Sequence, residues 1–171
     1  GYPLPRRWIE VEAASPVRLA HLDRCPAREG KYLWGLPLAD KTYSIVARDE
    51  PAYQNLSRED WMNQEGSTGC VIQSYQCDLL RRSGYPETKI LSPSSSIGVT
   101  LPPMLAHRRF DFIIADMPWR DGRHVEWQGT ELVRLFDLET ITTYVGAGPN
   151  LDPEVRRRLT SNPSIAVPNQ P

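Results

Sequence analysis

The chain has 171 residues, a length that corresponds to one domain or to one domain with a small appendage. Its 20 Lys and Arg residues against 21 Asp and Glu residues give a formal net charge of −1. This balance lacks the basic excess that non-specific nucleic-acid binding requires. No apolar run reaches the roughly 20 residues of a membrane-spanning helix. Composition therefore predicts a soluble protein with neither nucleic acid nor membrane as a partner.

The first part of the chain has the pattern of short strands. Residues 8–13 alternate apolar and polar side chains, and residues 43–47 are rich in β-forming types. Ser57 stands three positions before Asp60, which is a capping signal for a helix that begins there. We therefore predict a β-rich N-terminal extension over residues 1–56.

The clearest helical periodicity lies between Cys70 and Arg82, with Gly84 as its stop. If this whole segment is helical, Cys70 and Cys77 are separated by about 10 Å of rise, which exceeds the roughly 7 Å that a disulfide allows. The three cysteines, which include Cys25, are therefore predicted to be reduced. No Cys or His pair has zinc-finger spacing, so no metal site is predicted.

A meander of three strands is predicted after this helix. The Asp121-Gly122 and Gly129-Thr130 pairs are turn signals between its strands. We predict a core over residues 57–148 and a C-terminal tail over residues 149–171. The predicted strands are 110–117, 124–128 and 132–138, a helical turn is expected at 104–107, and the tail carries a short helix at 153–159.

Cys70 has the position of a nucleophile, because it joins a loop rich in Gly and Ser to the predicted start of a helix. Unsatisfied N–H groups and the helix dipole favour a thiolate there. Gln64 and the Cys70 N–H are candidate donors to an oxyanion. A Cys at the start of an amphipathic helix is also commonly a small core residue.

The segment 63–70 (NQEGSTGC) resembles the nucleophile segment of papain-like cysteine proteases, in which an Asn-Gln pair precedes the cysteine through a short loop. Trp61 matches a family habit as well, whereas Val71 stands where papain carries an aromatic residue. The resemblance implies an α+β, papain-like fold in which the nucleophile helix packs on a small antiparallel sheet.

The base and its orienting acid are sought downstream of the cysteine. His124 opens a predicted strand, and Asp137 lies on the next one. Folding these strands about Gly129-Thr130 predicts that Asp137 lies opposite His124 or one diagonal step away. His107 precedes two arginines and is read as a solvated loop residue. The expected catalytic set is therefore Cys70, His124, Asp137 and Gln64.

The predicted function is hydrolysis of an amide by a papain-like cysteine protease that acts on a specific protein substrate. No cofactor is expected, and the location is expected to be the cytoplasm or a target cell into which the protein is delivered. One alternative is a papain-like glutamine deamidase of a toxin or effector, because only 53 residues separate Cys70 from His124. Another is a non-catalytic interaction protein of a larger assembly.

Two further signals have simpler explanations. Residues 110–119 (FDFIIADMPW) resemble the strand and turn of adenine-N6 methyltransferases, but no Gly-rich cofactor loop precedes them. The carboxylates of Asp111, Asp116, Asp121 and Glu126 could suggest a metal-dependent nuclease. Charges spaced along a meander usually form a solvated face.

Overall fold

The structure, a computed structural model, describes residues 19–72, 74–93, 101–148 and 152–160. These residues belong to two compact units. Unit 2 runs from Thr42 to Thr140, and unit 1 holds the described residues before and after it. Two long strands, β2 (Leu33–Arg48) and β7 (Thr130–Ala147), each contribute to both units.

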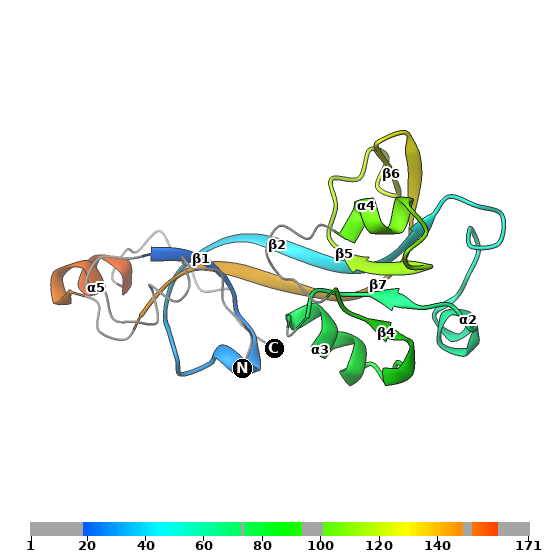
Figure 1. Ribbon diagram of the computed structural model, residues 1–171. Coiled ribbons are helices and arrows are strands. Elements are labelled where there is room, and N and C mark those ends of the chain that lie inside the picture. Colours follow the sequence, from blue (N-terminus) through cyan, green and yellow to red (C-terminus); the bar gives the residue numbers. More distant parts are fainter. Residues whose placement is uncertain (1–18, 73, 94–100, 149–151, 161–171) are drawn as a thin grey trace. The chain divides into compact units, whose positions relative to one another are not determined.

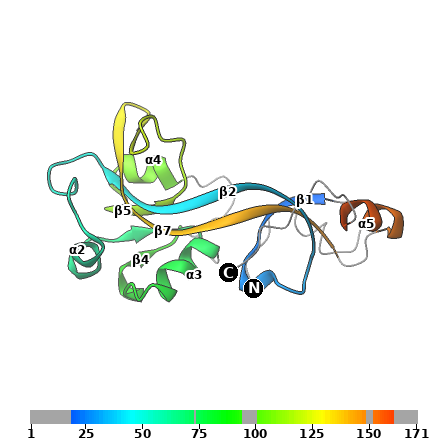
Figure 2. The same cartoon turned by 180° about the vertical axis from the view of Figure 1, so that it is seen from behind.

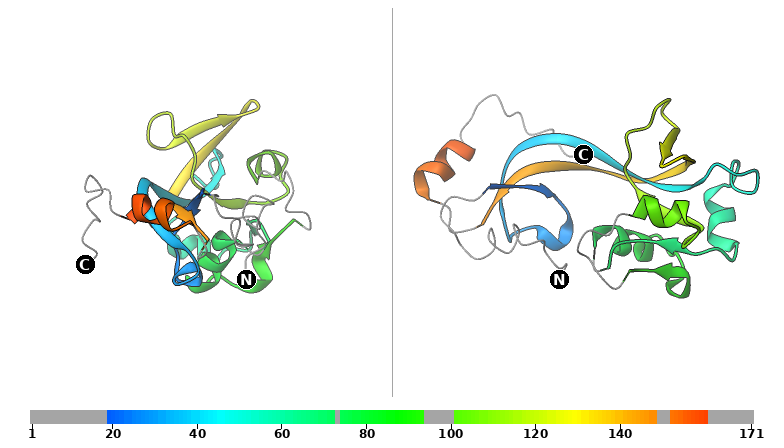
Figure 3. Two further views of the ribbon diagram at one scale, coloured as in Figure 1. Left: turned by 90° about the vertical axis from the view of Figure 1, so that its left-hand side faces the viewer. Right: turned by 45° about the horizontal axis from the view of Figure 1, so that its top comes forward.

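Unit 1 combines β1 (Leu19–Asp23), the 3-10 helix η1 (Pro26–Arg28) and α5 (Pro153–Thr160) with the first part of β2 and the end of β7. β1 pairs antiparallel with β7, with Leu19 opposite Ala147. Figure 3 shows β1 beside these strands. Buried Leu22 and Tyr32 form a small core with Trp34 packed against it.

Unit 2 contains a mixed sheet in the order β7-β2-β5-β3-β4, and β6 pairs with β7 as well. β2 and β5 are antiparallel, with Ser44 opposite Ala115. β3 is parallel to both β4 and β5. The elements are α2 (Arg58–Asn63), β3 (Thr68–Gly69), α3 (Tyr75–Arg82), η2 (Glu87–Lys89), β4 (Ile90–Leu91), α4 (Leu101–Ala106), β5 (Phe112–Ala115) and β6 (His124–Trp127).

The order β3-α3-β4-α4-β5 places helices between parallel strands of unit 2. α4 and β6 lie on one side of its sheet, and α2 and α3 lie on the other (Figures 1 and 2). The side under α4 has a core that includes Val46, Leu105, Ile113 and Leu132. On the other side, the buried Trp61 ring stacks on the Tyr85 ring at 4.2 Å between centroids.

Several predicted elements are confirmed. The capping box of Ser57 and Asp60 starts α2, and β2, β5, β6, β7, α4 and α5 overlap the segments predicted for them. The helix predicted from Cys70 begins at Tyr75, because the Ser74 side chain caps it by accepting from the Cys77 N–H. The predicted strand 8–13 lies outside the described residues.

The predicted architecture is wrong. A papain-like fold would place the nucleophile helix on a small antiparallel sheet, whereas here α3 connects two parallel strands of a mixed sheet. β3 and β4 have two residues each, which is too short for a period-2 pattern to be visible.

Candidate functional site

Cys70 forms a disulfide with Cys77, so the prediction of reduced thiols is wrong for this pair. Their Cα atoms are 5.3 Å apart, because the chain between Cys70 and the cap residue Ser74 is not helical and the assumed rise does not apply. Both side chains are buried, and the Ser92 Oγ lies 3.6 Å from the Cys70 sulfur and 3.4 Å from the Cys77 sulfur. A disulfide sulfur carries no proton and cannot act as a thiolate nucleophile.

His124 and Asp137 lie on the predicted hairpin but in a different register. The turn between β6 and β7 lies at Gln128-Gly129, one residue before the predicted Gly129-Thr130, because Thr130 already pairs with Trp127. Val133 is therefore the residue opposite His124. Asp137 lies four residues further along β7 and accepts a hydrogen bond of 2.7 Å from the Ser44 hydroxyl. The His124 Nδ1 is 2.8 Å from the Asp121 carboxylate instead.

Gln64 closes a turn at the end of α2. Its Oε1 accepts from the Gly66 N–H at 2.6 Å, and its Nε2 donates to the carbonyls of Trp61 and Gly66. Within the described part of the chain, no hydrogen bond or ion pair joins any two of Cys70, His124, Asp137 and Gln64. The structure thus leaves the four side chains in separate local networks.

A different group of residues follows the carboxyl ends of the parallel strands of unit 2. Gly69 at the end of β3 is opposite Leu91 of β4 and Ile113 of β5. The chain therefore leaves these strands toward the same edge, with Asp116 after β5, Ser92 after β4 and the loop to α3 after β3. In open sheets with parallel strands and helices, ligands bind outside this edge.

The chemistry of this edge is charged and polar. Asp116 is exposed and immediately follows β5. α3 begins after β3, and the N–H groups of its first turn have no carbonyl partner inside the helix. The Ser74 hydroxyl caps the helix, and the Cys70 N–H donates to the Leu91 carbonyl at 3.0 Å, which ties the start of the loop to β4.

The start of α3 is also anchored to β2 and β7. The Tyr75 hydroxyl donates to the Glu139 carboxylate, and its ring packs 5.8 Å from the Tyr43 ring. Burial, together with the hydrogen bond to Glu139, raises the pKa of Tyr75 to about 12. The Gln76 amide lies 3.5 Å from the Tyr43 hydroxyl. These contacts fix the orientation of the helix whose N-terminus faces the edge.

Neither a metal centre nor a membrane-spanning helix is found in the part of the chain that the structure describes. No group of three His, Cys, Asp or Glu side chains in the described ranges is arranged to hold a metal ion. None of the described helices has the length and apolar character needed to cross a membrane.

Comparison with known proteins gives a clear result only at the level of structure. No protein-family model matches the sequence, and no curated protein matches it. Solved structures do match. A mutant of arginine-bound ArgBP from T. maritima shares 16% identity with a TM-score of 0.60 over 82% of this chain and 62% of its own. The GluR0 ligand-binding core from Nostoc punctiforme, in complex with L-glutamate, shares 15% identity with a TM-score of 0.61 over 86% of this chain and 66% of its own.

A third match is the periplasmic sensor of the hybrid histidine kinase Hk1 from Borrelia burgdorferi. It shares 15% identity with a TM-score of 0.56 over 86% of this chain and 67% of its own. The chain thus spans about two thirds or less of the length of these structures. Their common fold is that of periplasmic solute-binding and Venus flytrap-type domains, and this chain has that fold.

These matches overturn the papain-like resemblance and the function drawn from it. The chain is similar in structure to ligand-binding domains, and neither a cysteine protease nor a glutamine deamidase is supported. The expected protein substrate is also contradicted, because two of the matched structures hold arginine and L-glutamate, which are small molecules. Of the functions weighed from the sequence, the non-catalytic alternative agrees best with these findings.

From the sequence, Asp116 is interpreted as part of a solvated face and not as a candidate for ligand binding. The available signal was the run of apolar residues 112–115 followed at once by an aspartate and then by Met117-Pro118. This pattern marks the carboxyl end of a buried strand. It gains meaning only when β5 is known to lie parallel to β3.

Proposed function

We propose that this chain is a non-catalytic binding module for a small α-amino acid. The observation that supports it is the juxtaposition of Asp116 and the N-terminus of α3 at the carboxyl ends of the adjacent parallel strands β5 and β3. The arginine and L-glutamate held by structures of the same fold agree with a ligand of this class.

The two groups are complementary to the two charges of an amino acid. A helix N-terminus attracts an anion through its unpaired N–H groups and its dipole, so the start of α3 suits the ligand carboxylate. The Asp116 carboxylate suits the ligand ammonium group. Asp78 in the first turn of α3 is ion-paired with Arg82 at 3.3 Å, which reduces the electrostatic repulsion between Asp78 and the ligand carboxylate.

The disulfide favours a location outside the reducing cytoplasm. Disulfides form and persist in oxidising compartments such as the bacterial periplasm. Cys70–Cys77 is such a bond, and one of the matched structures is a periplasmic sensor. We therefore place the proposed binding function in the periplasm or another oxidising compartment.

The test is a titration of the full chain with the twenty amino acids, followed by thermal unfolding and calorimetry. A ligand at 100 times its Kd should stabilise the folded state by about 2.7 kcal/mol. The best ligand should lose at least about tenfold in affinity when its carboxylate is replaced by an amide, because the helix N-terminus then meets no anion.

Asp116→Asn should lower the affinity for the same ligand by at least about tenfold, since it removes the negative charge proposed to pair with the ammonium group. Glu126→Gln is the matched control, because it neutralises an exposed carboxylate on β6. The proposal fails if none of the twenty amino acids binds, or if Asp116→Asn binds as tightly as the control.

A further inference from the structure

Unit 2 contains a pocket of about 420 Å³ that includes no residue of the Asp116 and α3 edge. Its walls are the loop 54–56 that follows β2, Arg123 before β6, and residues 134–137 of β7. The volume lies in the range of small-molecule sites, which is roughly 300–1,000 Å³. The pocket therefore has room for an organic ligand.

The charge of the pocket is positive. Its lining includes two arginines, Arg123 and Arg134, and one carboxylate, Asp137. The Asp137 Oδ1 already accepts the Ser44 hydroxyl at 2.7 Å, and it lies 3.7 Å from the Arg134 Nε, which is longer than a hydrogen bond. One positive charge thus remains without a carboxylate in the pocket.

Arg134 is held in place and has open donors. Its guanidinium carbon lies 5.9 Å from the centroid of the Trp119 ring, and its side chain is 33% exposed. Among the residues that the structure describes, its guanidinium makes no hydrogen bond, and its ion pair with Asp137 spans 3.7 Å. Arg123 is fixed as well, because its Nη2 donates to the Gln54 carbonyl at 2.6 Å.

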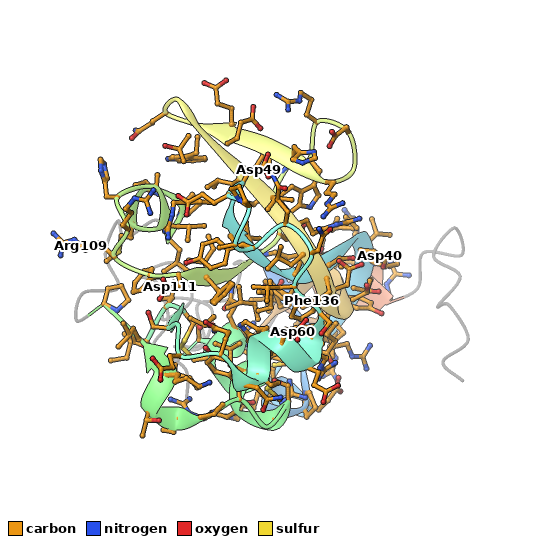
Figure 4. All side chains as sticks on the ribbon, turned by 90° about the vertical axis from the view of Figure 1, so that its right-hand side faces the viewer. Asp40, Asp49, Asp60, Arg109, Asp111 and Phe136 are labelled. Atoms are coloured by element: carbon orange, nitrogen blue, oxygen red, sulfur yellow. A yellow bond between two sulfur atoms is a disulfide. The ribbon has the colours of Figure 1, made fainter. Side chains whose placement is uncertain are left out.

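The remaining walls are partly apolar. Leu56, Leu135 and Phe136 line the pocket, and the Phe136 ring is fixed edge-on against Trp61 with 5.5 Å between centroids. Figure 4 shows Phe136 on β7 close to α2, the helix that carries Asp60. A ligand that fits these walls has an apolar body next to its negative charge.

We infer that this pocket binds a small organic carboxylate through Arg134 and Arg123. A planar carboxylate matches the forked donors of a guanidinium group, and the apolar body contacts Phe136 and its neighbours. The ligand differs from the proposed amino acid in its site and needs no ammonium group. The inference therefore goes beyond the proposed function and does not depend on it.

The experiment titrates the full chain with benzoate, benzamide and inorganic phosphate, using calorimetry and amide NMR shifts. Benzoate should bind saturably with one site per chain, and the shifts should map to residues 54–56 and 134–137. Benzamide has the same shape without the charge, and it should bind at least about tenfold more weakly.

Arg134→Gln should lower the affinity for benzoate by at least about tenfold. Arg123→Gln should lower it by a smaller factor, because one donor of Arg123 already binds the Gln54 carbonyl. Arg109→Gln is the matched control, since Arg109 is exposed and its side chain projects away from unit 2 (Figure 4). A circular dichroism melt of each variant confirms that it is folded before its affinity is compared.

Four results would overturn the inference. The first is the absence of saturable benzoate binding, and the second is equal affinity of Arg134→Gln and Arg109→Gln. The third is tighter binding of phosphate than of benzoate, which would assign the pocket to an inorganic anion. Shifts confined to the edge around Asp116 would also contradict it.

Discussion

Cys70 and Cys77 are joined across the start of α3, with Cα atoms 5.3 Å apart and both sulfurs buried. The bond connects the residue after β3 to the first turn of α3 and lies against Ser92, the residue after β4. A single covalent link therefore fixes the position of the helix N-terminus relative to the carboxyl edge of the parallel strands.

Loss of this link should destabilise the chain. The Cys70→Ala, Cys77→Ala double variant should lower the free energy of unfolding by about 2–3 kcal/mol, because a loop of about eight residues is no longer closed in the unfolded state. Urea denaturation measures the change. Cys25→Ala with the disulfide intact is the control for mutating a buried cysteine, and equal stability of the double variant and the wild type would contradict the prediction.

Gly69 should not tolerate a side chain. A Cβ at this position would lie 2.5 Å from the Phe110 ring, so Gly69→Ala should cost about 1–3 kcal/mol of stability through overpacking. Gly122→Ala is a useful comparison, since its φ of +78° carries only backbone strain of about 1–2 kcal/mol and a Cβ there meets nothing within 4 Å. Replacing the ring with a smaller side chain, Phe110→Leu, should restore part of the stability lost in Gly69→Ala. A Gly69→Ala variant as stable as the wild type would contradict the close approach of Gly69 to the Phe110 ring.

Tyr75 should make the stability sensitive to alkaline pH. Its pKa is raised to about 12 from an ordinary value of 10, because burial and the hydrogen bond to Glu139 favour the neutral phenol. A group with a raised pKa stabilises the fold fully below pH 10 and loses that contribution as the pH rises toward 12. The free energy of unfolding, measured with denaturant at pH values between 9 and 12, should fall more steeply for the wild type than for Tyr75→Phe. Parallel curves would contradict the prediction.

Arg48 should be essential for the attachment of α4 to the sheet. It is 4% exposed, and its Nη1 donates to the carbonyls of Leu105 at 2.9 Å and Phe110 at 2.8 Å. Arg48→Met leaves both carbonyls without this donor and should cost about 3 kcal/mol. Hydrogen exchange should then speed up in α4 while α3 keeps its protection. An unchanged exchange rate in α4, with Arg109→Gln as the exposed control, would show that these bonds are dispensable.

Local signals in the sequence were sufficient for most single elements. The Ser57 capping box begins α2, the run 112–115 forms β5, and Gly129 lies in the turn that joins β6 to β7. Each of these depends on residues within a few positions of one another. Period-2 alternation, caps and turn residues act over that range, so the sequence alone carries them.

The function predicted from the segment 63–70 was wrong because it was drawn from a local pattern, and a local pattern does not show which distant residues meet. The spacing of Gln64 and Cys70 is a local feature, whereas a catalytic set needs residues that are distant in sequence to meet. The register of β6 and β7 places Val133, and not Asp137, opposite His124. Cys70 forms a disulfide with Cys77 and so has no free thiol. A one-residue change of register reverses the face of every side chain, and local patterns do not fix it.

The sequence by itself determined the approximate positions of most helices and longer strands, together with a balanced charge that disfavours nucleic-acid binding. Only the tertiary structure decided that β3 runs parallel to β4 and β5, and so that Asp116 and the start of α3 share an edge. The physical reason is the length of β3 and β4, two residues each, which leaves their pairing to long-range contacts such as the Cys70 N–H bond to the Leu91 carbonyl. The positively charged pocket beside Arg134 likewise exists only because the loop 54–56 and β7 are brought together by the fold.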